Sequence, residues 1–257
     1  MNNVQKDAGN RLSCPTVDDA EVEKFDAAAT TWWDPRGSSG WLHRYNPLRV
    51  AYIRDAACRQ YGRDPTQVGA LRGLRVLDIG CGAGVLCEAL AKLHATVVGA
   101  DPAENLVQLA RFHAMQSEVQ VDYRCATAEA LAASGEQFDV VLAMEVVEHV
   151  AESAIFIQRC AELVKPGGLA ILSTINRTFM SFLFAIVMGE YVLRLLPLGT
   201  HQWKRFVRPG EIESTLARNG FRTVDLSGVT LNLHTAALQL SRNFQVNYLL
   251  TFERPKH

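Results

Sequence analysis

The segment Val76–Gly84, with the sequence VLDIGCGAG, combines one acidic residue with three alternating glycines. Its apolar first half predicts a strand, and the glycines predict a sharp turn into a helix that begins near Val85. Glycines in such a turn let a ligand lie directly against the main chain. Turns of this kind, between a strand and a helix, bind nucleotide-like ligands in open α/β sheets.

The spacing of the glycines, which are Gly80, Gly82 and Gly84, distinguishes between cofactors. A dinucleotide fingerprint needs a small residue three positions after the second glycine, and this chain has Val85 there. The carboxylate of Asp78 would repel a pyrophosphate but can accept hydrogen bonds from a cationic or amino-bearing ligand. S-adenosylmethionine carries an ammonium and a sulfonium and no phosphate, so the segment is predicted to bind this cofactor. The alternative is an ordinary tight turn that binds no ligand.

Two further residues at predicted strand ends are candidates for cofactor binding. Asp101 lies seventeen residues after Gly84, where a carboxylate can bind both ribose hydroxyls of S-adenosylmethionine or of NAD. Aspartate at this place is also a common helix cap, so Asp101 counts mainly in combination with the glycine turn. Met144 can present its backbone or its thioether to the adenine, or it can simply fill the core.

Glu145, Glu148 and His149 follow the same strand at positions i, i+3 and i+4, and they share one face if the segment is helical. Two carboxylates and an imidazole suit Mg²⁺ completed by substrate oxygens. The same residues can instead supply a general base for a phenol, whose pKa near ~10 keeps it protonated at neutral pH. His149 is then the natural base. The third interpretation is a solvated acidic helix start.

Alternating strands and helices are expected to position these residues. Strands are predicted over 75–79, 95–100, 119–124, 137–143 and 169–174, and helices over 85–93, 105–116 and 154–164. Strands separated by single helices form a parallel, doubly wound sheet. A later helix over 209–219 precedes strands over 221–226 and 245–252, which must run antiparallel because no helix joins them. The predicted fold is α/β and Rossmann-like, with a seven-stranded, mostly parallel sheet and an antiparallel last strand.

The rest of the chain is expected to form one domain, 18–257, after a disordered tail at 1–17. Helices over 21–33 and 48–61 would form an N-terminal lid at 18–62, from which Arg49 or Arg44 can meet the carboxylate of the cofactor's methionine moiety. The net charge of −1 and the absence of a polybasic block speak against a nucleic-acid binder. Six cysteines without a C-x-x-C pair are typical of a reduced cytosolic protein.

An insert at 177–208 interrupts the alternation. Its residues 178–189 include no formal charge, but they are too few to span a bilayer, which takes ~20 apolar residues. The whole insert holds five basic residues and one acidic residue. An apolar helix flanked by positive charge suits an anionic membrane surface, so membrane contact is predicted through 178–196. A buried lid helix or a dimer contact is the alternative.

Taken together, these motifs resemble one family, the bacterial ubiquinone biosynthesis O-methyltransferases, which are class I S-adenosylmethionine-dependent enzymes. Besides the glycine turn, the matching segments are FDAAATTWWD (25–34), LHRYNPLR (42–49), VLAMEVVEHV (141–150), LVKPGG (163–168), STINR (173–177) and VNY (246–248). The glycine turn marks any class I methyltransferase. The WWD, LHRYNPLR and STINR segments are much more specific to this family.

The resemblance implies O-methylation of polyprenylated phenols and catechols at two steps of the ubiquinone pathway, as 2-polyprenyl-6-hydroxyphenol methylase and 3-demethylubiquinol 3-O-methyltransferase. It implies cofactor roles for Arg49, Gly80, Asp101 and Met144. In metal-dependent members it also implies a cation role for Glu145, Glu148 and His149.

The protein is accordingly expected in the cytoplasm, peripherally attached to the inner membrane and in contact with other enzymes of ubiquinone biosynthesis. The alternatives are a methyltransferase of another lipid or small phenol and a non-catalytic scaffold that binds S-adenosylmethionine.

Overall fold

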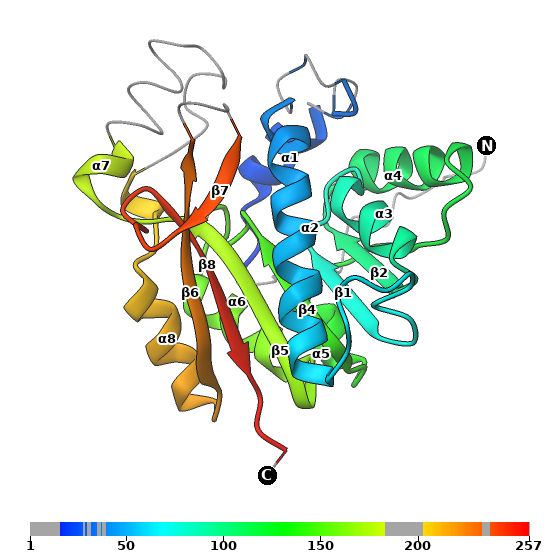
Figure 1. The fold of residues 1–257 in the computed structure, drawn as a ribbon. Helices are drawn as coiled ribbons and strands as arrows, with labels where there is room; N and C mark the ends of the chain where they lie inside the picture. Colours follow the sequence, from blue (N-terminus) through cyan, green and yellow to red (C-terminus); the bar gives the residue numbers. More distant parts are fainter. Residues whose placement is uncertain are drawn as a thin grey trace, which may run out of the picture.

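The computed structural model describes residues 16–27, 29, 32–34, 37, 40–182, 203–232 and 237–256, and its centre is one mixed sheet (Figure 1). The strands are β1 (Arg75–Ile79), β2 (Thr96–Asp101), β3 (Asp122–Cys125), β4 (Phe138–Met144), β5 (Val164–Ile175), β6 (Arg222–Leu231), β7 (Leu238–Ser241) and β8 (Asn247–Glu253). Their order in the sheet is β3-β2-β1-β4-β5-β8-β6-β7.

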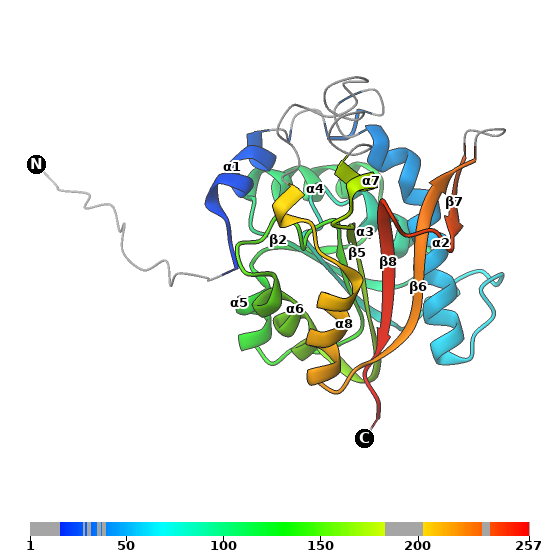
Figure 2. The same ribbon diagram turned by 90° about the vertical axis from the view of Figure 1, so that its left-hand side faces the viewer.

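Helices cover both faces of the sheet (Figure 2). They are α1 (Asp19–Ala27), α2 (Gly40–Tyr61), α3 (Val85–Lys92), α4 (Glu104–Gln116), α5 (Ala128–Ala133), α6 (Ser153–Glu162), α7 (Phe179–Ser181), the 3₁₀ helix η3 (Trp203–Arg205) and α8 (Pro209–Arg218). One apolar core lies beneath α2, α3 and α4, and the other lies beneath α5, α6 and α8. Each face of the sheet is therefore buried.

The five strands from β3 to β5 pair in parallel, as the alternation in the sequence predicts. Strand β8 lies between β5 and β6 and runs antiparallel to both. The predicted fold class, with its antiparallel last strand, is thus confirmed. Because parallel strands share a direction, the carboxyl ends of β1, β2 and β4 meet at one edge of the sheet, where ligands bind in such folds.

Three elements differ from the sequence prediction. The described sheet has eight strands instead of seven, because β7 forms between the predicted strands over 221–226 and 245–252, where no strand was predicted. Strand β5 begins at Val164, since Gly167 and Gly168 bond to the backbone of Arg254 instead of forming a loop. Helix α2 begins at Gly40, so Pro47 lies inside it. The side-chain amide of the neighbouring Asn46 donates a hydrogen bond to the carbonyl of Val85, the first residue of α3, at 3.0 Å.

The described chain also differs from the prediction near its start. Residues 1–15 of the predicted tail lie outside the described residues, but Thr16 is buried and its carbonyl accepts a hydrogen bond from the amide of Ala151. Residues 16 and 17 therefore belong to the folded domain. Helix α1 ends at Ala27, before the Trp32–Trp33 turn.

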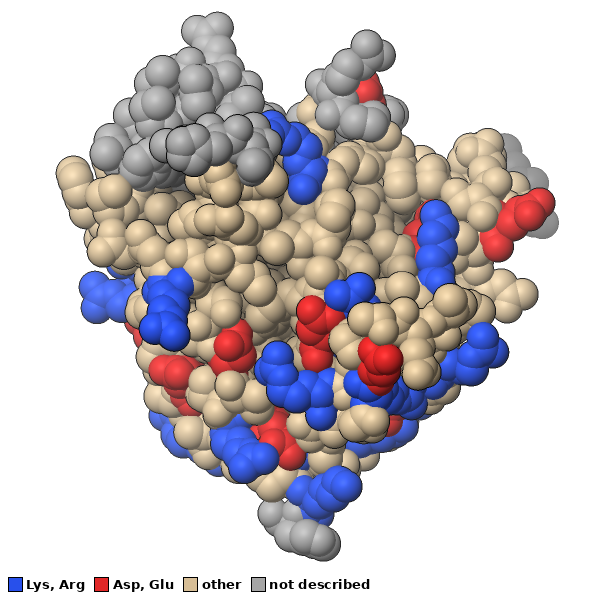
Figure 3. All heavy atoms as spheres, in the orientation of Figure 1, with Lys and Arg blue, Asp and Glu red and all other residues tan. Residues whose placement is uncertain are grey.

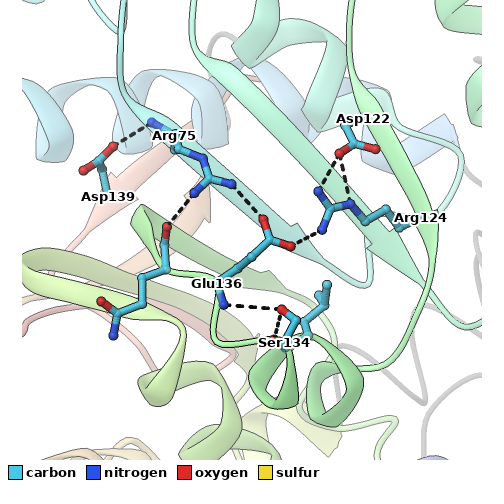
Figure 4. A network of polar contacts seen from close by, with 8 residues as sticks. Arg75, Asp122, Arg124, Ser134, Glu136 and Asp139 are labelled. Carbon is cyan, nitrogen blue, oxygen red and sulfur yellow. Dashed lines mark hydrogen bonds and ion pairs between the residues drawn. The ribbon is translucent and has the colours of Figure 1, made fainter.

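A network of ion pairs holds the sheet at the end opposite the ligand edge (Figure 4). The Arg75 guanidinium lies 2.8 Å from the Glu136 carboxylate, which also pairs with Arg124, and Arg124 in turn lies 2.6 Å from Asp122. The backbone amide of Arg75 donates a hydrogen bond to Asp139 at 2.7 Å. These contacts connect the beginnings of β1, β3 and β4.

This network makes stability depend on Glu136 and on pH. Its hydrogen bonds with Arg124 and then Arg75 lower the pKa of Glu136. A lowered pKa means that the stabilisation is present above the usual carboxyl range and is lost as pH falls through the folded-state value. We expect Glu136→Gln to lower the free energy of unfolding at pH 7 by about 1 kcal/mol, since the pairs are partly exposed and screened by solvent.

Urea denaturation at pH 7 and pH 3 measures this effect, with Glu118→Gln at another exposed carboxylate as the control. The difference between wild type and Glu136→Gln should be smaller at pH 3 than at pH 7. An equal difference at both pH values would show that the charge of Glu136 contributes nothing.

Candidate active site

A pocket of about 650 Å³ opens where β1, β2 and β4 end. The glycine turn and Asp101 line one part of it, and Glu145, Glu148 and His149 line another. Helix α1 and residues of the N-terminal part of α2 close the remaining side (Figure 1). The structure thus brings the candidate cofactor residues and the candidate catalytic residues into one cavity.

The glycine turn has a backbone that only glycine adopts readily at three places. The φ angles of Gly80, Gly82 and Gly84 are 72°, 53° and 86°. Space is also lacking, because a Cβ atom at Gly82 would lie 2.8 Å from the ring of Trp32, and one at Gly84 would lie 2.1 Å from the hydroxyl of Tyr123. The turn therefore presents bare backbone to the pocket.

Asp101 connects the end of β2 to this turn. Its Oδ2 accepts the amide hydrogen of Gly82 at 2.9 Å, and its Oδ1 accepts that of Ala103 at 2.9 Å. The side chain is buried, which raises its pKa to about 6. Each carboxylate oxygen has a second lone pair, so Asp101 can still accept hydrogen bonds from two ribose hydroxyls in the pocket.

Asp78 and Arg49 form the opposite part of the cofactor site. Asp78 is buried, accepts the Cys87 thiol at 3.3 Å and has its pKa raised by burial to about 6. Arg49 is only 5% exposed and donates one hydrogen bond, from Nη2 to Asn46 at 3.0 Å. Its buried Nε has no partner among the described residues. Arg49 therefore retains a donor for an anionic group such as the carboxylate of S-adenosylmethionine.

Met144 is the last residue of β4. The sequence left open whether it contacts the adenine or fills the core. It lines the pocket and also packs into the core beneath α2 and α3. Contact with the adenine and a role in the core are thus compatible.

The condition for a shared helical face is not met, since residues 145–149 form a bend followed by a turn. The reason is the backbone of Glu145, whose φ is 60° and whose amide continues the sheet by donating to the carbonyl of Ser173 at 3.0 Å. Glu145 and Glu148 nevertheless both face the pocket, bonded to the hydroxyls of Ser173 and Thr174, each at 2.7 Å. Burial and then the nearby Glu148 raise the pKa of Glu145 to about 8.

His149 has a partner that sequence reasoning missed. Its Nδ1 lies 2.8 Å from the carboxylate of Glu21 on α1, and its ring meets that of Phe25 edge-on at 4.9 Å. The only available signal was the i, i+4 spacing of Glu21 and Phe25 in a predicted helix.

The predicted metal set is not assembled. The described residues hold no group of three or more His, Cys, Asp or Glu side chains that could bind a metal ion. Glu145 and Glu148 are bonded to hydroxyls, and His149 is bonded to Glu21. Residues 183–202, most of the predicted membrane segment, lie outside the described residues. No helix in the described part combines the length and apolar character needed to cross a bilayer.

Known proteins resemble this chain over most of its length. A family of proteins described as a methyltransferase domain matches residues 51–226. A ubiquinone biosynthesis O-methyltransferase of Chelativorans sp. is 52% identical over 240 residues, which are 93% of this chain and 95% of that protein. The protein of the same name from Brucella anthropi is 50% identical, again over 93% of this chain and over 97% of its own length.

The fold also matches solved structures of methyltransferases. Magnesium protoporphyrin IX methyltransferase from Synechocystis, solved with bound S-adenosylmethionine, aligns with a TM-score of 0.61 and 21% identity. The alignment covers 93% of this chain and 98% of that one. The described sheet therefore has the fold of these methyltransferases.

The buried carboxylates make cofactor binding sensitive to mutation and to pH. We expect Asp101→Ala to weaken S-adenosylmethionine binding by about 2 kcal/mol, because hydrogen bonds to a charged group are lost. Binding to the wild type should also weaken below about pH 6, where Asp78 and Asp101 take up protons.

Calorimetry between pH 5 and pH 8 measures both effects, and Asp64→Ala, at an exposed carboxylate outside the pocket, is the control. Unchanged affinity in Asp101→Ala would contradict the assignment of Asp101 to the ribose.

Proposed function

Because the chain belongs to the ubiquinone biosynthesis O-methyltransferases, we propose that it methylates phenolic oxygens of polyprenylated ubiquinone precursors with S-adenosylmethionine. We infer the reaction type and the pathway from the family relation, which is 52% identity over 93% of the chain. The two substrates, a 2-polyprenyl-6-hydroxyphenol and a 3-demethylubiquinol, are the finer part of the proposal. Their shared chemistry is an aromatic hydroxyl on a ring that carries an apolar tail.

The pocket supports this proposal because it joins a cofactor cradle to acid–base groups in one cavity. Arg49, Asp78 and Asp101 lie on the cofactor side, and Glu145 and His149 lie on the other. Apolar side chains line much of the cavity next to the catalytic residues, including Val150, Phe156, Ile175 and Val246. An apolar lining of this kind suits an aromatic ring and the first part of a polyprenyl chain.

The proposed reaction is a direct in-line transfer. The substrate oxygen gives its proton to His149 and bonds to the methyl carbon. The bond from that carbon to sulfur breaks, and its electron pair remains on sulfur. Holding oxygen, carbon and sulfur in line supplies most of the acceleration. Near neutral pH the raised pKa of Glu145 keeps its carboxyl protonated, so it can donate a hydrogen bond to a second substrate oxygen.

A divalent cation such as Mg²⁺ is implied by the resemblance alone. The side chains that would bind it do not fit, because His149 points to Glu21 and the two glutamates are bonded to hydroxyls. A cation requirement stays a prediction, and no step of the reaction above passes through a metal.

For the segment 178–196 we propose contact with an anionic membrane surface, which would place the enzyme at the cytoplasmic face of the inner membrane. Its described flanks support this, since Phe179, Phe182 and Trp203 are exposed beside Lys204 and Arg205. Figure 3 shows that the described charged side chains gather toward the opposite end of the molecule. Such contact would leave the tail in the lipid while the ring reaches the pocket, and it would bring in neighbouring enzymes of the pathway.

Replacement of His149, the proposed base, tests whether the protein is an enzyme or a non-catalytic scaffold that binds S-adenosylmethionine. We expect His149→Ala to reduce turnover by about 100-fold, a usual size for loss of a general base, while cofactor affinity stays the same. The assay compares short-chain analogues of both precursors with unsubstituted catechol, and His94→Ala is the control. Equal turnover of catechol and of the precursors would point to another small phenol as substrate. Unchanged turnover in His149→Ala would contradict its role as the base.

Removal of the insert tests the membrane contact. Deletion of residues 179–196 should abolish cosedimentation with vesicles that contain an anionic lipid, because the apolar surface that enters the interface is lost. Calorimetric binding of S-adenosylmethionine to the deletion variant is the control for folding. If the deletion variant still sediments with the vesicles, the membrane contact lies elsewhere.

A further inference from the structure

Helix α1 brings a carboxylate to the proposed base from the far end of the chain. Glu21 and Phe25 lie one turn apart on this helix, and both contact His149. The Nδ1 of His149 is 2.8 Å from the Glu21 carboxylate, and the two side chains are 16% and 13% exposed. Both residues line the pocket. The contact thus belongs to the site and is shielded from most solvent.

The position of Glu21 is fixed by contacts at both ends of its helix. The carboxylate of Asp18 accepts the amide hydrogens of Ala20 and Glu21 and lies 2.8 Å from Arg205. Near the other end, the carboxylate of Asp26 accepts the amide hydrogen of Asn105 at 2.8 Å. Helix α1 has no fully buried residue, and these polar contacts act together with the packing of Val22 and Phe25 against a small apolar cluster that includes Ala83.

The chemistry of the pair decides where the proton on His149 lies. A glutamate carboxylate is ordinarily ionised at neutral pH and can only accept hydrogen bonds, and that of Glu21 lies 2.8 Å from Nδ1 of His149. Nδ1 must then carry the hydrogen, which leaves the lone pair of Nε2 as the proton acceptor. The edge of the Phe25 ring restricts rotation of the imidazole. An ionised carboxylate also stabilises the imidazolium that forms when Nε2 takes a proton.

We propose that Glu21 is a positioning residue for methyl transfer, holding His149 with Nε2 free to accept the proton of the substrate hydroxyl. The inference rests on the proposed function, in which His149 is the base. The hydroxyl proton moves to Nε2, the oxygen bonds to the methyl carbon, and the carbon–sulfur bond breaks with its electrons left on sulfur. Glu21 keeps its charge throughout and acts through His149.

Kinetics of variants on one helix test this role. We expect Glu21→Ala to lower kcat by about tenfold, less than loss of the base itself, with KM for both substrates within about twofold of wild type. Glu21→Gln keeps an oxygen that can accept from Nδ1, so its kcat should lie between those of Glu21→Ala and the wild type. Glu23→Ala, at an exposed glutamate of the same helix, should match the wild type.

A spectroscopic measurement excludes a merely structural role. In ¹⁵N-labelled protein, the imidazole signals that disappear in His149→Ala identify this residue. They should show a hydrogen on Nδ1 in the wild type and a mixture of tautomers in Glu21→Ala. An unchanged tautomer in Glu21→Ala would overturn the proposal, and so would a raised KM with an unchanged kcat. Unchanged circular dichroism and cofactor affinity establish that Glu21→Ala is folded.

Two further comparisons separate this inference from the proposed function. If His149→Ala loses turnover and Glu21→Ala does not, the positioning role fails and the base assignment stands. If neither variant loses turnover, the base assignment has failed.

Titration of Glu21→Ala with Mg²⁺ tests whether His149 is a metal ligand. Restoration of Glu21→Ala to full kcat by excess Mg²⁺ would make His149 a metal ligand and overturn the positioning role of Glu21.

Discussion

The parallel register of β2, β1 and β4 is the constraint on which the site depends. Ile79, the last residue of β1, pairs with Ala100 on one side and with Ala143 on the other, so the three strands end together. The pairing even extends into the glycine turn, where the amides of Gly80 and Cys81 both donate to the carbonyl of Ala100. Three chain segments that are far apart in sequence therefore bring side chains at or near the carboxyl ends of their strands into one pocket.

Those side chains are mainly carboxylates, and their burial has an energetic cost. Burial raises the pKa of Asp78 and Asp101 to about 6 and, together with Glu148, that of Glu145 to about 8. Buried charges are tolerated when hydrogen bonds or opposite charges compensate them. Backbone amides compensate the buried charge of Asp101. The cationic groups of S-adenosylmethionine would compensate the negative charge of the whole cavity. A pocket built in this way favours a positively charged ligand over a pyrophosphate.

A feature of this structure can be predicted from the sequence when the residues that form it lie close together along the chain. The glycine turn, strand β1 and helix α3 could be predicted, because their signals lie within a few residues of one another. The bend at Glu145 could not, since its conformation follows from pairing with Ser173 on the next strand. The contact between Glu21 and His149 joins residues 128 positions apart and leaves no periodic pattern. The short strand β7 likewise forms only because β6 offers an edge to pair with.

Two polar side chains that line the pocket, those of Glu21 and Arg49, come from outside the general methyltransferase domain. That domain begins at residue 51, after Glu21, Phe25 and Arg49. Within it, the glycine turn and Asp101 can hold a nucleoside in any enzyme of this fold. The N-terminal segment contributes Arg49, whose buried Nε has no partner among the described residues, and the Glu21 carboxylate, which we propose orients His149. Because chemistry in such folds is specified by groups attached to a common sheet, this segment is where O-methylation would be distinguished from other transfers.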